Sequence, residues 1–207
     1  MLITIEGIDG SGKSSLVKGL QAELCDLDPL FTREPGSGWL GDVVRRGIAE
    51  EIDPVAEALL FVADHALHLD TVVRPALADH RLVISDRYSD SRYAYQAVTL
   101  EGRIPDPLAW LRQVHGDWTI RPDLTFLLVV PVEEAVRRLS GAKTPEHFER
   151  ADVLEKVQKV YLDLVCGDPE RFVICDGMMP EEEVRDFVAG EIRSTAALSR
   201  SHLSRSR

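Results

Sequence analysis

The side chains best suited to chemistry lie in a glycine-rich segment near the start of the chain. Residues 7–14 read GIDGSGKS, the pattern G-x4-G-K-S, directly after an apolar run and ahead of a helical stretch. Glycines in this pattern let backbone N–H groups curl around an anion, and the helix N-terminus adds partial positive charge behind them. Lys13 can reach the β- and γ-phosphates of a nucleotide, and the Ser14 hydroxyl can ligate Mg²⁺. We therefore predict a phosphate-binding loop (P-loop) whose contacts come from Gly7, Asp9, Gly10, Ser11, Gly12, Lys13, Ser14 and Ser15.

The rest of the sequence narrows the reaction that such a loop could serve. A GTPase reads guanine through an N-K-x-D motif, but the chain contains no asparagine. Its D-x-x-G match, Asp9–Gly12, lies inside the P-loop itself. Motor-like ATPases are usually longer than this chain of 207 residues. These features favour a small kinase that phosphorylates a nucleotide.

Composition restricts the fold and the partners. The chain is long enough for one domain with a sizeable core. Its 24 basic and 35 acidic residues give a net charge of −11, which argues against nucleic acid as a partner. No apolar run approaches the roughly 20 residues of a membrane span, and the opening MLITIEG carries no charged leader. Three cysteines without a CxxC pair favour a reducing, cytoplasmic setting.

The elements that must position the P-loop alternate along the chain. Short runs rich in Val, Ile, Leu and Phe are typical of buried strands, and the longer stretches between them are typical of helices. This alternation predicts an α/β fold, with a five-stranded parallel sheet, helices on both faces and ligands at the carboxyl ends of the strands. We expect one domain over 1–193 and a flexible Ser/Arg-rich tail over 194–207. The expected strands are 2–6, 29–32, 82–85, 124–130 and 172–175, and the expected helices are 13–25, 40–49, 54–78, 89–97, 106–116, 132–140, 148–166 and 180–193.

Further motifs make the sequence specific. They are TREPG at 32–36, SDRY at 85–88, the pattern D-S-x-x-A-Y-Q at 90–96 and RPDLT at 121–125. Read with the P-loop, they make the chain similar to thymidylate (dTMP) kinases, which are three-layer P-loop kinases. The resemblance implies transfer of the γ-phosphate of ATP to dTMP with Mg²⁺, and a homodimer packed through helix 54–78.

The resemblance also implies roles for individual residues. Arg87 would hold the acceptor monophosphate, a dianion that suits a guanidinium group. Tyr95 would crowd the ribose 2′ position and favour deoxyribose. Asp86, Ser14 and Asp9 would hold Mg²⁺. The expected catalytic residues are Lys13, Arg87, Asp9, Lys143 and Glu149, and the expected acceptor-binding residues are Asp9, Arg33, Glu34, Pro35, Arg45, Phe61, His65, Arg87, Ser91, Arg92 and Tyr95.

Several of these roles have a plainer alternative. Asp86 could be the N-cap of the helix that follows it. Arg87 could pair with a neighbouring acid, and Arg45 could lie on a solvated helix face. Tyr95 could be a buried tyrosine with a satisfied hydroxyl.

Helix 54–78 has two contrasting faces. One is an apolar stripe from Val55 to Val73, and the other is polar apart from Phe61. A large aromatic side chain on a polar face needs a cover, either core packing or a stacked base. In the family a phenylalanine at this place stacks on thymine. The stripe is compatible with a dimer interface, although the domain's own core could absorb it, and Pro75 should kink or end the helix.

Two acceptor positions depart from the family pattern. His65 stands where an arginine commonly donates to O4 of thymine, and neutral histidine donates one hydrogen bond without a permanent charge. Arg92 stands where a serine or asparagine contacts the N3–H and O2 edge of the base. Arginine only donates, so it cannot accept from N3–H. Either Arg92 turns away, or it takes over O4 from the other side, or the base is not thymine.

The predicted lid, about residues 140–150, carries few cations. Lys143 is the candidate that closes over the phosphates, and Arg137, Arg138 and Arg150 flank it. Glu149 matches a family glutamate near the acceptor phosphate.

Three functions are compatible with these features. The first is dTMP phosphorylation by Mg-ATP. The second is the same transfer to a different or modified pyrimidine nucleotide, which His65 and Arg92 would explain. The third is a non-catalytic nucleotide-binding or assembly protein, suggested by the thin lid and by Val129 where many relatives have aspartate. The complete P-loop and the SDRY segment argue against the third.

Overall fold

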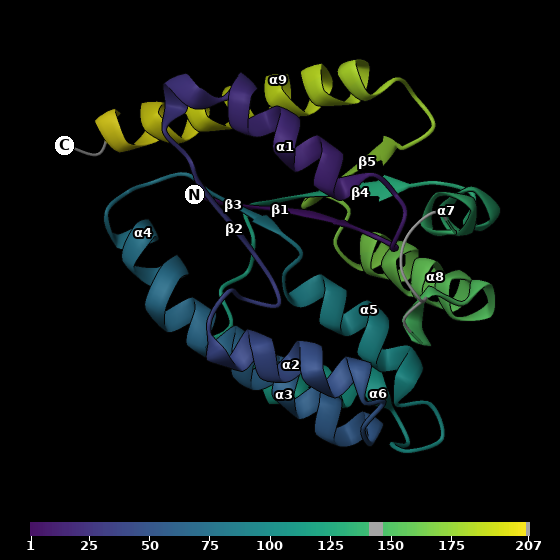
Figure 1. Ribbon diagram of the computed structural model, residues 1–207. Helices are drawn as coiled ribbons and strands as arrows, with labels where there is room; N and C mark the ends of the chain where they lie inside the picture. Colours follow the sequence, from purple (N-terminus) through teal and green to yellow (C-terminus); the bar gives the residue numbers. More distant parts are fainter. Residues whose placement is uncertain (141–146, 206–207) are drawn as a thin grey trace.

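A five-stranded parallel sheet forms the centre of the molecule (Figure 1). The computed structural model describes residues 1–140 and 147–205, with side chains as far as Leu198. The strand order β2–β3–β1–β4–β5 puts β1, which leads into the P-loop, in the middle of the sheet. The predicted α/β fold with a parallel sheet is therefore confirmed. The strands are β1 (Leu2–Gly7), β2 (Leu30–Arg33), β3 (Val83–Asp86), β4 (Leu124–Val129) and β5 (Phe172–Asp176).

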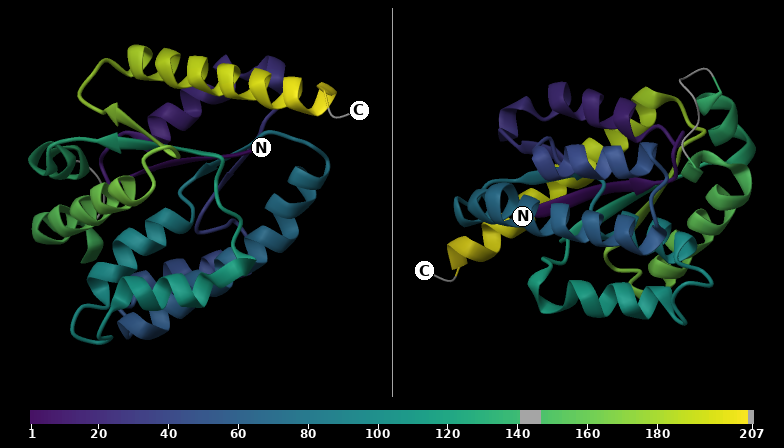
Figure 2. Two further views of the ribbon diagram at one scale, coloured as in Figure 1. Left: turned by 180° about the vertical axis from the view of Figure 1, so that it is seen from behind. Right: turned by 60° about the horizontal axis from the view of Figure 1, so that its bottom comes forward.

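Helices cover both faces of the sheet, so that the molecule has three layers (Figure 2). One face is covered by α1 (Lys13–Glu23) and α9 (Glu181–Arg205), which lie above the sheet in Figure 1. The opposite face is covered by α5 (Ser89–Thr99) and α8 (Ala151–Gly167). The other described helices are α2 (Trp39–Ala49), α3 (Pro54–His68), α4 (Arg74–Ala78), α6 (Pro107–His115) and α7 (Val132–Leu139), with 3-10 turns at Cys25–Leu27, Gly116–Trp118 and His147–Glu149 and a π-helical turn at Leu69–Val73.

Side chains along β1 alternate between two different environments. Ile3 and Ile5 pack against α1 and α9 in an apolar cluster. On the opposite face Thr4 shares a hydrogen bond of 2.8 Å with Thr125, and Glu6 bonds to α5 and α8. The core beneath α5 and α8 therefore contains polar groups, and these are bonded to one another as buried polar groups must be.

The helix boundaries differ from the expected ones where local chemistry intervenes. The single helix expected over 54–78 is interrupted by the π-helical turn just before Pro75. Proline has no N–H to donate to the carbonyl four residues earlier, so the α-helical hydrogen-bond pattern is interrupted before it. Pro75 does not end the helix, which continues through it to Ala78 as α4. The helix expected to end near residue 193 runs on to Arg205, because the sequence after it contains no glycine or proline to stop it.

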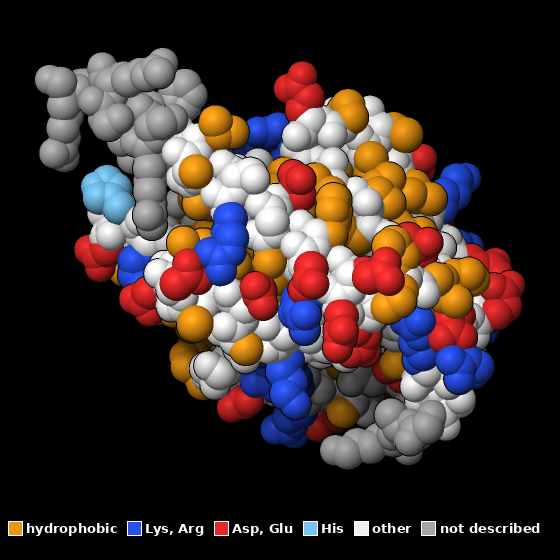
Figure 3. Space-filling view, turned by 90° about the horizontal axis from the view of Figure 1, so that it is seen from above, with side chains coloured by type: hydrophobic (Ala, Val, Ile, Leu, Met, Phe, Trp, Pro, Cys, Tyr) orange, Lys and Arg blue, Asp and Glu red, His pale blue; other side chains and the backbone are white. Residues whose placement is uncertain are grey.

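The space-filling view from above shows apolar side chains between charged ones on the α9 side of the molecule (Figure 3). Phe187 of α9 and Ile174 of β5 are both about half exposed.

Of the helices in the described ranges, none is both long and apolar enough to cross a bilayer.

Helix α3 turns its polar face inward. Asp53 caps its first turn by accepting from the N–H groups of Val55 and Ala56. Glu57, Asp64, His65 and His68 are buried, whereas Ala56, Leu59, Ala63 and Ala66 of the apolar stripe are exposed. The domain's own core therefore does not absorb the whole stripe, which leaves an apolar surface on the outside of α3.

The start of α2 packs directly on the loop that follows β2. A methyl group on Gly41 would lie 1.9 Å from the carbonyl oxygen of Gly36, too close for any real contact. This loop contains Glu34 and Pro35, which line the cavities described below, so the absence of a side chain at Gly41 helps to hold it in place.

We predict that Gly41→Ala lowers the free energy of unfolding by about 1–3 kcal/mol, because the methyl group overpacks this contact. Gly190 of α9 is the matched control, since a methyl group there would meet nothing within 4 Å. Gly190→Ala should raise stability by up to about 1 kcal/mol, the usual gain for glycine to alanine in a helix. Urea unfolding of both variants measures this, and equal effects would contradict the close packing.

Candidate active site

Two adjoining cavities open at the carboxyl edge of the sheet. The larger, about 860 Å³, is lined by the P-loop from Asp9 to Ser15 and by residues of α7 and the start of α9. The smaller, about 280 Å³, lies toward α3 and α5. The two cavities share four lining residues, which are Asp9, Arg33, Glu34 and Arg87. Two ligands that fill them would therefore meet beside Arg87 and Asp9.

The P-loop adopts the backbone that its glycines allow. Gly10 has a φ of +79°, and a methyl group there would lie 2.4 Å from the carbonyl oxygen of Ala135 in α7. Lys13 is buried, and its Nζ donates to the carbonyl oxygen of Ile8 at 2.7 Å. Burial, together with the neighbouring Arg87, lowers the pKa of Lys13 to about 8. Because water solvates this ammonium group poorly, a charge-assisted hydrogen bond to a phosphate anion would stabilise its charged form.

Arg87 is fixed at the end of β3 by its backbone. Its φ of +66° lies in the left-handed region, which is uncommon for a residue with a side chain. Its N–H donates to the carbonyl oxygen of Ile5 at 3.0 Å, and its carbonyl oxygen accepts from the Ser85 hydroxyl at 2.7 Å. This turn sends the side chain into the region that both cavities share.

The Arg87 guanidinium pairs with Asp9 of the P-loop. The hydroxyl of Tyr95 donates to Asp9 Oδ2 at 2.9 Å and accepts from the Asp9 N–H at 2.8 Å. Burial alone would raise the pKa of Asp9, but Arg87 and Lys13 hold it below its usual range. Arg87 does pair with an acid and the Tyr95 hydroxyl is satisfied, as the plainer alternatives expected, yet both residues also line the smaller cavity.

The smaller cavity has an aromatic and a cationic wall. Phe61 of α3 lines it and is only partly buried. Arg92 of α5 also lines it, together with Arg45, whose guanidinium pairs with Asp42 at 2.7 Å and is partly exposed. A planar apolar surface beside guanidinium groups suits a nucleotide base with a phosphate.

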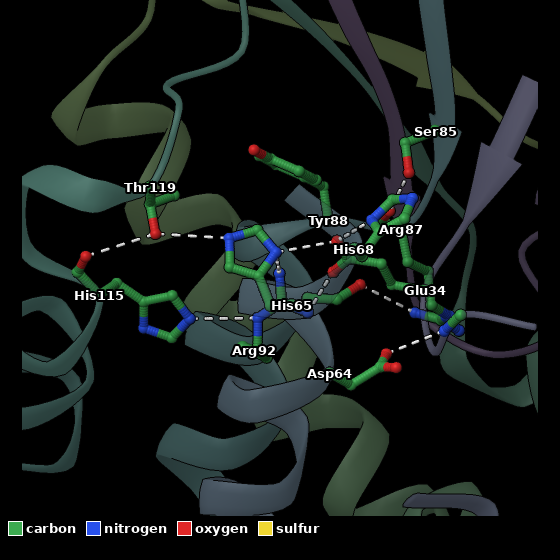
Figure 4. A network of polar contacts seen from close by, with 12 residues as sticks. Glu34, Asp64, His65, His68, Ser85, Arg87, Tyr88, Arg92, His115 and Thr119 are labelled. Atoms are coloured by element: carbon green, nitrogen blue, oxygen red, sulfur yellow. Dashed lines mark hydrogen bonds and ion pairs between the residues drawn. The ribbon is translucent and has the colours of Figure 1, made fainter. Parts of the chain in front are cut away.

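Behind this cavity lies a buried network around Glu34 (Figure 4). Arg92 pairs with Glu34 Oε2, and its Nε donates to His115 Nε2 at 3.2 Å. His65 Nδ1 lies 2.8 Å from Glu34 Oε1 and 3.0 Å from Arg92 Nη2. His68 Nδ1 lies 2.6 Å from the same Glu34 oxygen. The two departures from the family pattern, His65 and Arg92, are therefore neighbours in one network.

Electrostatics in this network favour one charge state. Burial and the Arg92 charge lower the pKa of His65 to about 4, and they lower that of His115 to about 3. Burial alone would raise the pKa of Glu34, but Arg92 and His65 keep it well below its usual range. The network therefore holds an ionised Glu34, a charged Arg92 and neutral imidazoles at His65 and His115 near pH 7.

The residues expected to hold Mg²⁺ lie around the larger cavity. Ser14 and Asp86 both line it, and helix α5 begins at Ser89 without a side-chain cap, so Asp86 is not its N-cap. Asp9 already bonds through both carboxylate oxygens to Arg87 and Tyr95. Within 1–140 and 147–205 no cluster of three or more acidic, histidine or cysteine side chains forms a metal site. Mg²⁺ needs only one or two protein oxygens when it is bound with nucleotide phosphates, so Ser14 and Asp86 fit it.

Most of the residues predicted for the site come together. His65 is fully buried and lines neither cavity, so it lies behind the pocket wall formed by Arg92. Glu149 lines the smaller cavity, while Lys143 lies outside the described residues. Arg137 and Arg138 line the larger cavity, where Arg138 donates to the carbonyl oxygen of Gly177 at 3.1 Å. Gln96 and Phe148 also line the smaller cavity; Gln96 belongs to the pattern at 90–96 and Phe148 precedes Glu149, but neither was predicted as a site residue. Other lining residues that sequence reasoning missed carry no motif and are brought there by the fold, namely Ile48 at the smaller cavity and Met179, Glu181, Glu182 and Arg185 at the larger one.

We predict that the His65 imidazole stays neutral well below pH 6. A histidine in the unfolded chain takes up its proton near pH 6.5, whereas folded His65 does so only at about 4. Between these values the unfolded state binds more protons, so folding stability should fall as the pH drops through this interval. Imidazole NMR shifts across the titration measure it, and a His65 midpoint near 6.5 would contradict the buried network.

Comparison with known proteins agrees with this geometry. The family model for thymidylate kinase matches residues 5–188. A probable thymidylate kinase of Methanoculleus marisnigri is 64% identical over 200 residues, which are 97% of this chain and 98% of that relative. A probable thymidylate kinase of Methanospirillum hungatei is 61% identical over 191 residues, 92% of each chain. Another, of Natronomonas pharaonis, is 48% identical over 185 residues, 89% of this chain and 93% of the relative. The chain belongs to the thymidylate kinase family.

Proposed function

We propose that this protein transfers the γ-phosphoryl group of ATP to dTMP and forms dTDP and ADP. The observation that carries the proposal is the meeting of two cavities at Arg87 and Asp9, one lined by a complete P-loop and the other by Phe61 and Arg92. Family membership supports the same reaction. The larger cavity takes ATP and the smaller takes the acceptor nucleotide.

The acceptor is held at its phosphate, its sugar and its base. Arg87, with Arg33 and Arg45 beside it, binds the phosphate dianion. Tyr95, tied to Asp9, faces the sugar. The ring of Phe61 stacks on the base.

Arg92 reads the edge of the base. A guanidinium carries five N–H groups; among the described residues the Nε of Arg92 donates to His115, and its Nη1 forms an ion pair with Glu34. The remaining N–H groups can donate to a carbonyl oxygen, such as O4 of thymine, but cannot accept from the amino group of cytosine. His65 then supports Arg92 instead of touching the base itself.

The chemistry requires positioning more than covalent participation. An oxygen of the acceptor phosphate attacks the γ-phosphorus of ATP, a new P–O bond forms, and the bond to the β,γ-bridging oxygen breaks. Lys13 and Arg87 neutralise charge on the two phosphate groups that must approach each other. Arg137 and Arg138 line the larger cavity and supply further positive charge to ATP, and Glu149 lines the acceptor cavity. Lys143, outside the described residues, stays a predicted catalytic cation.

Mg²⁺ would be held by Ser14 and Asp86, with Asp9 nearby. Bound there with the nucleotide, it would neutralise phosphate charge and help to orient the transferred group. Both side chains line the larger cavity, which supports this assignment.

We predict a clear preference for dTMP in a panel of dTMP, dUMP, dCMP, UMP, CMP, dGMP and dAMP with Mg-ATP. The kcat/KM for dCMP should be about 10²-fold lower or more, because its amino group leaves the Arg92 donors unpaired.

We predict that Lys13→Ala lowers kcat by about 10²-fold or more, because it removes a charge that stabilises the transferred phosphate. Its circular dichroism spectrum should match that of the wild type, which would show that the fold is intact.

Preference for another base would make Arg92 and His65 the determinants of a different specificity. Binding of ATP without turnover of any acceptor would favour a non-catalytic role. Wild-type activity in Lys13→Ala would contradict the P-loop assignment.

We also propose that two copies pack through the outer face of α3. That face presents Ala56, Leu59, Ala63 and Ala66 to the outside, and Leu59 is 47% exposed. Small residues around one leucine let a second helix approach closely. Because the polar face of α3 is already bonded inside the domain, a second copy is the partner that would bury the apolar one.

We predict that Leu59→Glu converts the dimer to a monomer, because a carboxylate would be buried without a partner in the interface. Leu162→Glu on α8 is the matched control, since Leu162 is 39% exposed on another surface. Light scattering after size-exclusion chromatography measures the mass. A wild-type monomer, or a dimer in which Leu59→Glu is tolerated, would refute this interface.

A further inference from the structure

We propose that Glu6 is a positioning residue for Arg87, and that it sets the affinity for the acceptor phosphate without touching it. The inference rests on the proposed function, in which Arg87 binds that phosphate. Glu6 lies on β1, is fully buried and lines neither cavity. It acts through two separate arms, one on the backbone of the Arg87 turn and one on the guanidinium.

The first arm holds the left-handed turn. Glu6 Oε1 accepts the N–H of Tyr88, the residue directly after Arg87, at 2.7 Å. Together with the bonds of the Arg87 peptide groups to Ile5 and Ser85, this bond fixes the backbone on both sides of the residue. A left-handed conformation for a residue with a side chain is unfavourable and persists only where the surroundings determine it.

The second arm reaches the guanidinium through Ser91. Arg87 Nη1 donates to Ser91 Oγ at 3.2 Å, and Ser91 Oγ donates to Glu6 Oε2 at 2.5 Å. The direction of this chain is forced, because a guanidinium only donates and a carboxylate only accepts. With Glu6 ionised, the Ser91 hydroxyl donates to Glu6 Oε2 and accepts from Arg87 through a lone pair, and the Tyr161 hydroxyl, 2.8 Å from Ser91 Oγ, donates to the same Glu6 oxygen.

The setting of Glu6 argues against a purely structural role. Its direct hydrogen-bond donors are neutral, namely the Tyr88 N–H, Ser91 and the Tyr161 hydroxyl at 2.8 Å. A buried carboxylate without a direct counter-ion is unfavourable, and well-packed apolar side chains generally stabilise a core better. Burial and the nearby Asp90 raise the pKa of Glu6 to about 7, which shows how poorly the site solvates the charge. The ionised form of Glu6 accepts from the Tyr88 N–H and from Ser91, and its support of the Arg87 turn explains why a carboxyl group stands here.

The test is Glu6→Gln, which keeps the shape but replaces one acceptor oxygen with a donor NH₂ group. If the amide oxygen stays on Tyr88, the NH₂ group donates to Ser91 and competes with Arg87. If the amide group flips, its NH₂ group faces the Tyr88 N–H, and these two donors cannot form a hydrogen bond with each other. We expect the KM for dTMP to rise about 10-fold, in line with the sensitivity of reactions to small misplacements, while the KM for ATP changes less than about twofold.

Two further variants separate positioning from lost stability. Thr4→Val is the matched control, because Thr4 is buried on the same face of β1 and its hydrogen bond goes to Thr125, away from Arg87. It should lower the melting temperature and leave both KM values unchanged. Ser91→Ala removes the hydroxyl that links Arg87 to Glu6, so it should also raise the KM for dTMP. In the double variant Glu6→Gln/Ser91→Ala, the KM for dTMP should rise by less than the product of the two single fold-increases, because both substitutions break the same link.

The wild-type enzyme assayed alongside distinguishes the two proposals. Absence of dTMP turnover in the wild type would overturn the proposed function. If the wild type is active, an unchanged KM for dTMP in Glu6→Gln, or an equal rise in both KM values, would overturn the positioning role. Should Glu6→Gln fail to fold, an unchanged KM for dTMP in Ser91→Ala overturns it instead.

Discussion

The pairing of carboxylates with guanidinium groups at the carboxyl edge of the sheet is the constraint on which the site depends. Each pair joins two segments that are distant in sequence and largely closed to water. Removing one partner of such a pair leaves a buried charge, which is far more costly than loss of a surface ion pair. The pairs at this edge are Asp9 with Arg87 and Glu34 with Arg92, and a third buried pair, Asp90 with Arg171 at 2.6 Å, lies just before the start of β5.

These pairs explain how a chain of net charge −11 forms a site for phosphates. Three of the cations that line the acceptor cavity, Arg45, Arg87 and Arg92, are each held by an acid, namely Asp42, Asp9 and Glu34. Arg87 illustrates the balance, since Asp9 and the Ser91–Glu6 chain fix its guanidinium while it still lines both cavities. Helix α5 carries three participants, Asp90, Ser91 and Arg92, and therefore connects the residue before β5, Glu6 of β1 and Glu34 in the loop that follows β2.

Local patterns were sufficient to predict the P-loop and the strands, because each depends on residues that are neighbours in sequence. The role of Arg87 came instead from the SDRY motif and the family resemblance. The side of α3 that faces the core was not predictable in this way. Periodicity separates a polar face from an apolar one, but which face turns inward depends on partners such as Glu34 on another element. His65 looked like a base contact for the same reason, and Glu6 carried no signal within a strand pattern.

An experimental structure with dTMP and a non-hydrolysable ATP analogue tests the central claim most directly. The account predicts the dTMP phosphate on Arg87, the thymine ring against Phe61 and a carbonyl oxygen of the base within hydrogen-bond distance of Arg92, with Glu6 still bonded to Ser91. A dTMP phosphate that avoids Arg87, or a base that contacts neither Phe61 nor Arg92, would contradict it.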